Sequence, residues 1–204
     1  MAIKDKFFYI NIREYLQQDT SSEIGEPELM EMLSDFSCPK NPDVERFLKK
    51  SSIEFTKKNQ SVTYLVFSTN GGELLGYFTI ALKPLTVRGE TVSNTIKKKI
   101  QRVSELDEQL KTYTMSAFLI AQLGKNFTNG AEKKITGTEL LELAWTVIEE
   151  MQYIGGGMVT FLEANNEAKL LEFYTGNGFK KFDVRQTTSG NKEPHELIQL
   201  LRLL

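Results

Sequence analysis

Residues 117–179 constrain the fold most, because their pattern predicts a strand, a polar loop, a helix, a second strand and a second helix in that order. The first strand is the apolar run over residues 117–123. The helix opens at Thr136, whose hydroxyl can cap it while Glu139 reaches back from three residues later, the pattern of a capping box. Three glycines beginning at Gly155 end this helix. Its regularly spaced apolar residues predict that one face packs on a sheet.

The second half of this stretch predicts a strand over residues 158–162 and a helix that Asn165 or Asn166 can cap and that ends in residues 175–178, T-G-N-G. A strand, loop, helix and strand in this order predict a right-handed crossover between parallel strands. The loop and the helix N-terminus then lie at the carboxyl edge of the first strand. Ligands usually bind at such an edge.

The other segments show helical spacing or strand alternation. Residues 7–12 are apolar and β-prone, and their periodicity does not separate a first strand from the start of a short helix through Tyr15. A helix is predicted from Pro42, capped by Asn41, to about Lys58. Further predicted elements are a helix over residues 27–35, paired strands over 61–68 and 74–82 with Pro84 ending the second, and a strand over 179–184.

Composition bounds the class of protein. A chain of 204 residues with 40% hydrophobic content is long enough for one well-buried core, so we expect a single domain over residues 1–204. Lys and Arg total 25 against 27 Asp and Glu, and the formal charge of -2 gives no global attraction to nucleic acid or membrane. No apolar run reaches the roughly 20 residues of a membrane span.

Cys38 is the single cysteine, which excludes an intramolecular disulfide and favours a reducing cytoplasm. We expect it to be a small buried residue rather than a nucleophile, because free cysteines are usually buried. The one histidine, His195, is far from Cys38 in sequence, so no Cys/His set of zinc ligands is expected. The sequence therefore predicts a cytoplasmic protein without a metal centre.

The end of the central stretch resembles a known family. Phe173, Tyr174, Gly178 and Phe179 reproduce the F-Y-x-x-x-G-F ending of the GNAT acetyltransferase superfamily, and the upstream order of elements is similar to that family too. The resemblance implies an α/β (α+β) GNAT-like fold, with a mixed, mostly antiparallel central sheet of six to seven strands, splayed central strands and flanking helices. It also favours a final strand over residues 195–204, where leucine spacing alone fits a helix.

The resemblance implies acetyl-CoA as co-substrate. In GNAT proteins the strand corresponding to residues 117–123 offers backbone groups to pantetheine, and the following loop and helix N-terminus bind the pyrophosphate. Free N–H groups and the helix dipole capture the anion. The implied binding residues are Leu123, Gly124, Lys125, Lys133, Lys134, Ile135, Thr136, Gly137, Thr138 and Asn166. For Asn166, a helix cap is the open alternative to a hydrogen bond with pantetheine.

The phosphate loop departs from the family's pattern, Q/R-x-x-G-x-G/A, which falls on residues 132–137. Only Gly137 fits. Ile135 stands at a glycine position and Glu132 at the usual Gln or Arg. Lys133, Lys134 and the Thr136 hydroxyl can still hold phosphate oxygens, and backbone N–H groups do not depend on side-chain identity.

The implied reaction is direct transfer of acetyl from acetyl-CoA to an amine. Tyr174 matches the family's general acid, which protonates the leaving thiolate, and its alternative role is an aromatic residue packed on the sheet. Backbone N–H groups near residues 123–125 would polarise the thioester carbonyl. No general base is identified. Glu163, at the end of its strand, can take a proton or be an exposed carboxylate.

Two segments lie outside the minimal pattern: an N-terminal helical extension over about 13–40 and a helical insertion over about 88–112. In the insertion Asn94 is a candidate cap, with Ile96, Ile100 and Val103 on one face. The other faces carry Lys97, Lys98, Lys99 and Arg102. These cations favour either contact with a phosphate-rich substrate or a solvated helix face.

Three functions follow from the resemblance. The first is an N-acetyltransferase that acts on a primary amine of a small molecule, peptide or protein. The second is a toxin-type acetyltransferase that acts on aminoacyl-tRNA and has an antitoxin partner, because residues 36–48, F-S-C-P-K-N-P-D-V-E-R-F-L, are similar to the opening of toxin-related bacterial GNAT proteins. The third is a non-catalytic GNAT-like interaction module, supported by the missing loop glycine. The acceptor and a homodimer stay open.

Overall fold

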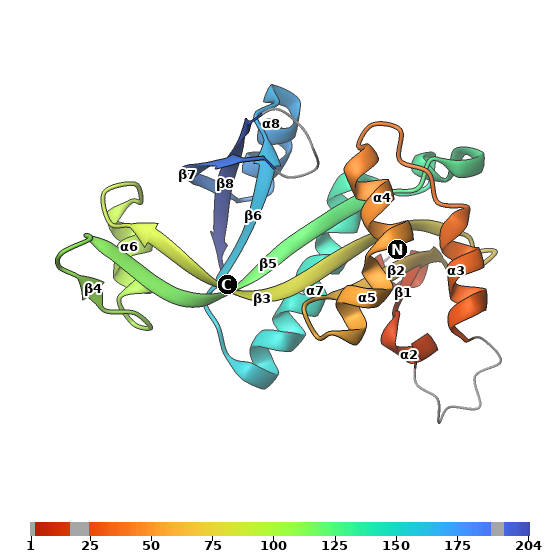
Figure 1. Ribbon diagram of the computed structural model, residues 1–204, viewed down its shortest axis with the longest axis horizontal. Helices are drawn as coiled ribbons and strands as arrows, with labels where there is room; N and C mark the ends of the chain where they lie inside the picture. The colour runs from red at the N-terminus through yellow and green to blue at the C-terminus, as the bar shows by residue number, and fades with distance from the viewer. Residues whose placement is uncertain (1–2, 17–24, 189–193) are drawn as a thin grey trace. The chain divides into compact units, whose positions relative to one another are not determined.

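A computed structural model describes residues 3–16, 25–188 and 194–204 of the chain. The chain forms two compact units. The first comprises Met1–Ala81 and Ala121–Val147, and the second comprises Leu82–Ile120 and Ile148–Leu204. Strand β3 (Leu74–Arg88), strand β5 (Thr112–Lys125) and helix α7 (Gly137–Gly155) contribute residues to both units (Figure 1). Residues 17–24 of the predicted N-terminal extension lie outside the described residues.

The described strands form one sheet in the order β1-β2-β3-β5-β6-β8-β7, with β4 paired to β5. The sheet is mostly antiparallel, as predicted, and the two-residue β4 brings it to eight strands. The remaining elements are α1 (Ile3–Lys6), β1 (Phe7–Asn11), α2 (Arg13–Leu16), α3 (Glu26–Ser34), α4 (Pro42–Lys50), α5 (Ser52–Lys57), β2 (Val62–Ser68), α6 (Asn94–Ile100), β4 (Leu106–Asp107), η1 (Thr128–Lys133), β6 (Val159–Asn165), α8 (Ala168–Gly176), β7 (Lys180–Thr187) and β8 (His195–Leu203).

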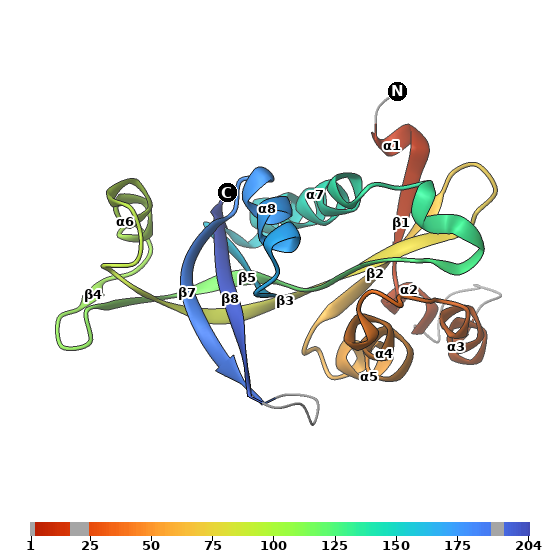
Figure 2. The same ribbon diagram turned by 90° about the horizontal axis from the view of Figure 1, so that it is seen from above.

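In the first unit, helices α3, α4 and α5 lie on one face of β1, β2 and β3, and α7 lies on the other face (Figure 2). The segment that periodicity left undecided is therefore a strand, β1, followed by a short helix. Side chains of alternating strand positions meet the helices in one buried core. Its fully buried members are Ile12, Leu29, Phe36, Leu48, Leu65 and Tyr77.

The helix predicted from Pro42 to about Lys58 is two helices, so this prediction is wrong at its middle. Ser51 interrupts it with φ -127° and ψ -28°, outside helical values. Serine competes for backbone hydrogen bonds, and here the Ser52 hydroxyl donates to the Leu48 carbonyl at 2.6 Å. The predicted start is confirmed, because the Asn41 side chain accepts hydrogen bonds from the first turn of α4.

Pro84 does not end the second hairpin strand as predicted, since β3 continues to Arg88. The register of β2 with β3 ends at Val62 and Ile80, so the Pro84 position has no partner in β2. Proline is tolerated where a strand has an unpaired edge, because its missing N–H then costs no hydrogen bond of the ladder.

In the second unit, β6 pairs in parallel with β5 and antiparallel with β8, which also pairs with β7. The predicted parallel crossover and the C-terminal strand are thus confirmed. The parallel register covers only Phe118 with Thr160 and Leu119 with Phe161, although β6 continues to Asn165. The strands therefore separate after two residue pairs, as expected of splayed central strands.

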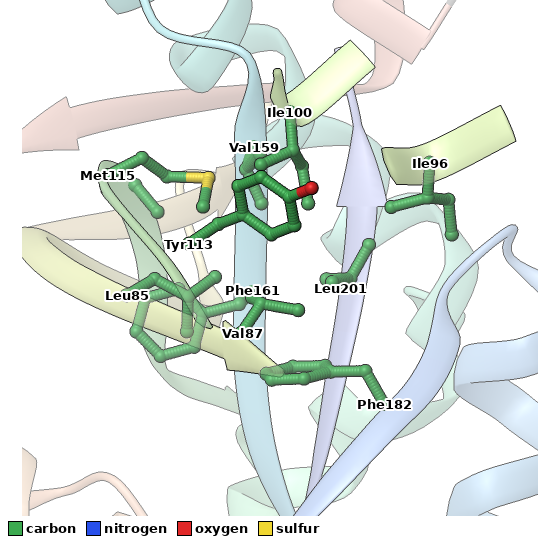
Figure 3. Close-up of a cluster of buried hydrophobic side chains, with 11 residues drawn as sticks. Leu85, Val87, Ile96, Ile100, Tyr113, Met115, Val159, Phe161, Phe182 and Leu201 are labelled. Carbon is green, nitrogen blue, oxygen red and sulfur yellow. The ribbon is translucent and has the colours of Figure 1, made fainter. Parts of the chain in front are cut away.

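A second buried core lies between α6 and the strands of this unit (Figure 3). Ile96 and Ile100 of α6 belong to it as predicted, whereas Val103 lies beyond the helix and is exposed. Two predicted caps are wrong. Ser93, not Asn94, caps α6 by accepting from the Ile96 N–H.

Helix α8 begins later than predicted, because β6 extends through Asn165 and the residue at the cap is Glu167. Neither Asn165 nor Asn166 therefore caps it. The predicted end is confirmed, with Asn177 at the C-cap and Gly178 at φ 86°, a left-handed conformation that glycine adopts without strain.

None of the helices in the described ranges is long and apolar enough to cross a membrane. Within the same ranges, no three His, Cys, Asp or Glu side chains gather as metal ligands.

Candidate functional site

The end of β5 contains the first three implied binding residues, and Gly124 among them is tightly enclosed. A Cβ added at Gly124 would lie 2.4 Å from Val44 Cγ1 and 3.3 Å from Tyr77 Cε1. A Cβ added at the neighbouring Gly76 would lie 2.7 Å from the Gly124 carbonyl oxygen. Two glycines therefore allow β3 and β5 to pack closely in the first unit, with α4 pressed against them.

Asn126 fixes the path of the chain as it leaves β5. Its side-chain oxygen accepts from the Ser37 N–H at 3.0 Å and the Thr128 N–H at 3.1 Å, and its amide donates to the Leu74 carbonyl at 2.9 Å. Only 5% of Asn126 is exposed, so these bonds are shielded from water. Sequence reasoning did not single out this residue. The only feature of the sequence that could have indicated it is its position in the polar segment directly after the apolar run over residues 117–123.

The loop after β5 is held by two of the predicted lysines. Lys125 Nζ donates to the Glu132 carbonyl at 2.6 Å and to the Ile135 carbonyl at 3.0 Å, so its charge supports the loop. Lys134 forms an ion pair with Glu73. Lys133 is exposed and has no ion pair with any residue in the described ranges, which leaves its ammonium available to a ligand.

Ile135, at the family's glycine position, is 1% exposed and belongs to the buried interior. The loop is therefore anchored by an apolar side chain in place of a flexible glycine. It contains its own left-handed residues earlier, at Asn129 (φ 52°) and Gly130 (φ 77°).

The predicted capping box at the start of α7 is confirmed. The Thr136 hydroxyl accepts from the Glu139 N–H at 3.1 Å, and the Thr136 N–H donates to Glu139 Oε2 at 2.9 Å. That backbone hydrogen bond, helped by Lys6 at 3.3 Å, holds the pKa of Glu139 below its ordinary value. Helix geometry leaves the Gly137 and Thr138 N–H groups without intrahelical acceptors, so they can bind an anion.

Tyr174, in the second unit, is the buried aromatic residue at the end of α8. It packs edge-on against Phe173 and Phe179, with ring centroids 5.0 Å and 5.9 Å away. Burial raises its pKa to about 12. Its hydroxyl has no hydrogen-bond partner among the described residues, and it keeps its proton at neutral pH. The phenol can therefore donate that proton to a ligand.

Two further candidates lie near the end of β6. Asn166 is exposed and follows the strand directly. Glu163 lies within the strand, and its carboxylate accepts from Arg185 Nη1 at 3.1 Å and from Gln199 Nε2 at 2.8 Å. Glu163 is therefore an ion-paired and hydrogen-bonded residue within β6 rather than an exposed carboxylate.

Cys38 is buried, as predicted, with 4% exposed. Burial raises the pKa of its thiol, which opposes a nucleophilic role. The chain around Cys38 has a structural role instead. The Phe127 N–H donates to the Ser37 carbonyl at 2.8 Å, so the 36–40 segment braces the exit from β5.

The structure gathers the predicted residues into two groups. The phosphate-loop set, from Leu123 to Thr138, lies in the first unit, while Asn166 and Tyr174 lie in the second. In the insertion, the cations Lys97, Lys98 and Lys99 of α6 have no ion pairs within the described ranges. The strands β4 and β5, which follow α6 in the chain, form a short antiparallel hairpin.

No protein-family model matches the chain, and no curated protein matches it in sequence. Solved structures do match it in fold. KacT, solved as a tyrosine-to-phenylalanine mutant, is 17% identical, with coverage of 95% of this chain and 94% of its own and a TM-score of 0.62. AtaT complexed with acetyl-methionyl-tRNAfMet is 16% identical, with coverage of 94% and 93% and a TM-score of 0.60.

The chain has the GNAT fold. A third match is a tyrosine-to-phenylalanine mutant of the AtaT toxin bound to acetyl-CoA and the C-terminus of the antitoxin AtaR. It is 15% identical, covers 97% of this chain and 93% of its own, and has a TM-score of 0.58. The fold expected from the F-Y-x-x-x-G-F ending is thereby confirmed, at identities that establish architecture alone.

Proposed function

We propose that the chain is an acetyl-CoA-dependent N-acetyltransferase that transfers acetyl directly to a primary amine of a small molecule, peptide or protein. The observation that carries the proposal is the fold match over 97% of the chain to AtaT solved with acetyl-CoA. Tyrosine-to-phenylalanine mutants of AtaT and KacT are among the matches, which directs attention to the buried phenol of Tyr174.

For the pyrophosphate, the proposed binding groups are the backbone N–H groups of Gly137 and Thr138 together with the ammonium of Lys133, which has no ion pair in the part of the chain that the structure describes. The N-terminus of α7 adds its partial positive charge. Lys125 and Lys134 are engaged with the loop and with Glu73, so their proposed part is to hold the loop in shape. Leu123, Gly124 and Lys125 would offer backbone groups to pantetheine, and Asn166 its side chain.

In the proposed reaction the amine nitrogen forms a bond to the thioester carbon and the carbon–sulfur bond then breaks. Backbone N–H groups near the end of β5 would stabilise the oxyanion. Tyr174 would donate its proton to the departing thiolate, and the amine would lose one proton to water. A phenol that stays protonated at neutral pH is in the form that this step requires.

The test is calorimetric titration of acetyl-CoA into the natural protein, a Gly137→Pro variant and a Gly137→Ala variant. Proline is accepted at the first helical position but removes the N–H, whereas alanine keeps it. We expect binding with a dissociation constant on the order of micromolar, in the usual range for enzyme substrates. Proline should weaken it at least fivefold and alanine should leave it unchanged. An absence of binding to the natural protein would refute the proposal and favour the non-catalytic module.

A second candidate function is acetylation of the amino group of an aminoacyl-tRNA, with an antitoxin partner. AtaT solved with acetyl-methionyl-tRNAfMet is the observation that favours it. The cations of α6, which form no ion pairs with other described residues, would suit a phosphate-rich acceptor. Incubation with acetyl-CoA and a mixture of charged tRNAs distinguishes the two functions, because acetylated aminoacyl-tRNA would form under the second and free amines would react under the first.

A further inference from the structure

A cavity of about 380 Å³ opens entirely within the second unit. Its volume falls in the range of small-molecule sites. Leu85, Leu119 and Phe161 form its apolar lining, and Glu163, Arg185 and Gln199 are among its polar groups.

The apolar lining is the edge of the unit's buried core, with 3% of Leu85 and 5% of Phe161 exposed. Leu85 and Phe161 belong to the buried cluster shown in Figure 3, and Leu119 packs against it. Helix α6 covers another part of that cluster with Ile96 and Ile100. Because the strands fix these side chains, the lining is preformed and would accept an apolar group without rearrangement.

The polar groups are held in place by one another. Glu163 and Gln199 are opposite each other in the register of β6 with β8, and the Gln199 amide donates to Glu163 Oε1 at 2.8 Å. Arg185 Nη1 donates to both oxygens of Glu163, at 3.2 Å and 3.1 Å. The carboxylate is thus satisfied, and its effect is to hold the guanidinium beside the cavity.

The remaining charge of the cavity is positive. Arg185 uses one nitrogen for Glu163, its side chain is 60% exposed, and its other N–H groups have no acceptor among the described residues. Lys83 also lines the cavity, is exposed, and has no ion pair within the described ranges. Two cations therefore face one carboxylate around an apolar lining.

We infer that this cavity binds the acceptor, and that the acceptor is an amine carrying both an apolar side chain and an oxyanion, either a carboxylate or a phosphate. The apolar group fits Leu85, Leu119 and Phe161, and the oxyanion pairs with Arg185 and Lys83. A guanidinium whose position is already fixed by Glu163 loses little freedom when it binds an oxyanion. The role as acceptor site rests on the proposed function, whereas the ligand class rests on the cavity.

The test uses three probes with one side chain: leucine, its aminophosphonate analogue, and leucinamide, which lacks the anion. Glycine tests the apolar requirement. Binding to the full chain is measured by ligand-observed NMR without acetyl-CoA. We expect at least one of the two anions to bind at least fivefold more tightly than leucinamide, and leucine to bind more tightly than glycine. Preference for the carboxylate or the phosphonate identifies the oxyanion.

Variants locate the site. Arg185→Gln and Lys83→Gln should each weaken binding of the preferred anion at least fivefold, while Lys181→Gln, an exposed cation of β7 outside the cavity, should not. Equal binding of leucinamide, no binding of any probe, or an equal effect of Lys181→Gln would overturn the inference. Since acetyl-CoA is absent, a failure of the calorimetric test above refutes the proposed reaction and is distinguishable from a failure here.

Discussion

Removal of one oxygen atom at Tyr174 separates its proposed catalytic role from its structural role. The ring packs against Phe173 and Phe179, and phenylalanine keeps those contacts. The hydroxyl has no hydrogen-bond partner among the described residues, so Tyr174→Phe leaves no donor or acceptor unpaired. We expect the free energy of unfolding to change by less than about 1 kcal/mol, because the substitution removes no intramolecular hydrogen bond between described residues.

The expected effect on catalysis is much larger. Loss of a general acid lowers kcat by about a hundredfold or more. A hundredfold loss corresponds to about 2.7 kcal/mol of transition-state stabilisation. Since the pKa of Tyr174 is raised to about 12, the natural protein should show no loss of activity from this residue as pH rises from 7 to 10. Acetyl-CoA affinity should not change, because the proposed role of the phenol is to protonate the leaving sulfur.

The assays are thiol release for kcat, calorimetry for acetyl-CoA affinity and urea denaturation for stability. Tyr113→Phe is the matched control within the same unit, because the Tyr113 hydroxyl is buried and accepts from Gln101 Nε2 at 3.0 Å. It should lower stability by about 0.5–1.5 kcal/mol and leave kcat unchanged. A Tyr174→Phe variant with kcat within threefold of the natural protein, or with a stability loss above about 2 kcal/mol, would refute the reasoning.

Three further predictions concern the first unit. Gly124→Ala should lower the free energy of unfolding by about 1–3 kcal/mol, because its Cβ would meet Val44 Cγ1 at 2.4 Å. In urea denaturation, the double variant with Val44→Ala should recover part of this loss. Strictly additive effects of the two substitutions would contradict the prediction. Asn126→Ala should lower the free energy of unfolding by about 3 kcal/mol, because three buried hydrogen bonds are lost. A shift of the urea midpoint equivalent to less than about 1 kcal/mol would contradict this prediction. Glu139 has a lowered pKa, so its stabilisation is present above the unfolded value of about 4.3 and lost as pH falls through the folded value. Glu139→Gln should therefore be less stable at pH 7 by about 0.5–1 kcal/mol, and this difference should shrink as the pH is lowered below the unfolded value; a difference that does not change with pH would exclude the charge as its cause.

The parts of the fold that were predictable depend on residues close together in the chain. The capping box joins Thr136 to Glu139, and the end of α8 needs only the local left-handed conformation of Gly178. The crossover from β5 through α7 to β6 followed from the order of elements. The fold family followed from the residues around Tyr174. Each of these signals is complete within a short stretch.

The features of the fold and site that the sequence did not predict depend on contacts between residues that are far apart in the chain. Pro84 is accepted in β3 because the pairing with β2 ends before it, and that register is set some twenty residues earlier. Lys125 is among the residues that the resemblance implies for cofactor binding, and its ammonium is used by carbonyls of the following loop. Asn126 holds the site through Ser37, which is remote in sequence. Side-chain chemistry alone cannot choose between such partners and a ligand.

Ile135 stands where the family pattern has glycine, and the structure predicts that Ile135→Gly would destabilise the protein. Its side chain is 1% exposed, so Ile135→Gly would open a cavity and add backbone freedom, at a cost of about 3 kcal/mol or more. The N–H groups proposed to bind phosphate come from the backbone of Gly137 and Thr138, which the substitution does not improve. We therefore expect Ile135→Gly to lose stability in urea and to bind acetyl-CoA no more tightly in calorimetry. Ile135→Val, which keeps most of the side chain, should cost only about 0.5–1.5 kcal/mol. Tighter binding by the glycine variant with little loss of stability would show that the loop needs flexibility rather than the anchor that Ile135 provides.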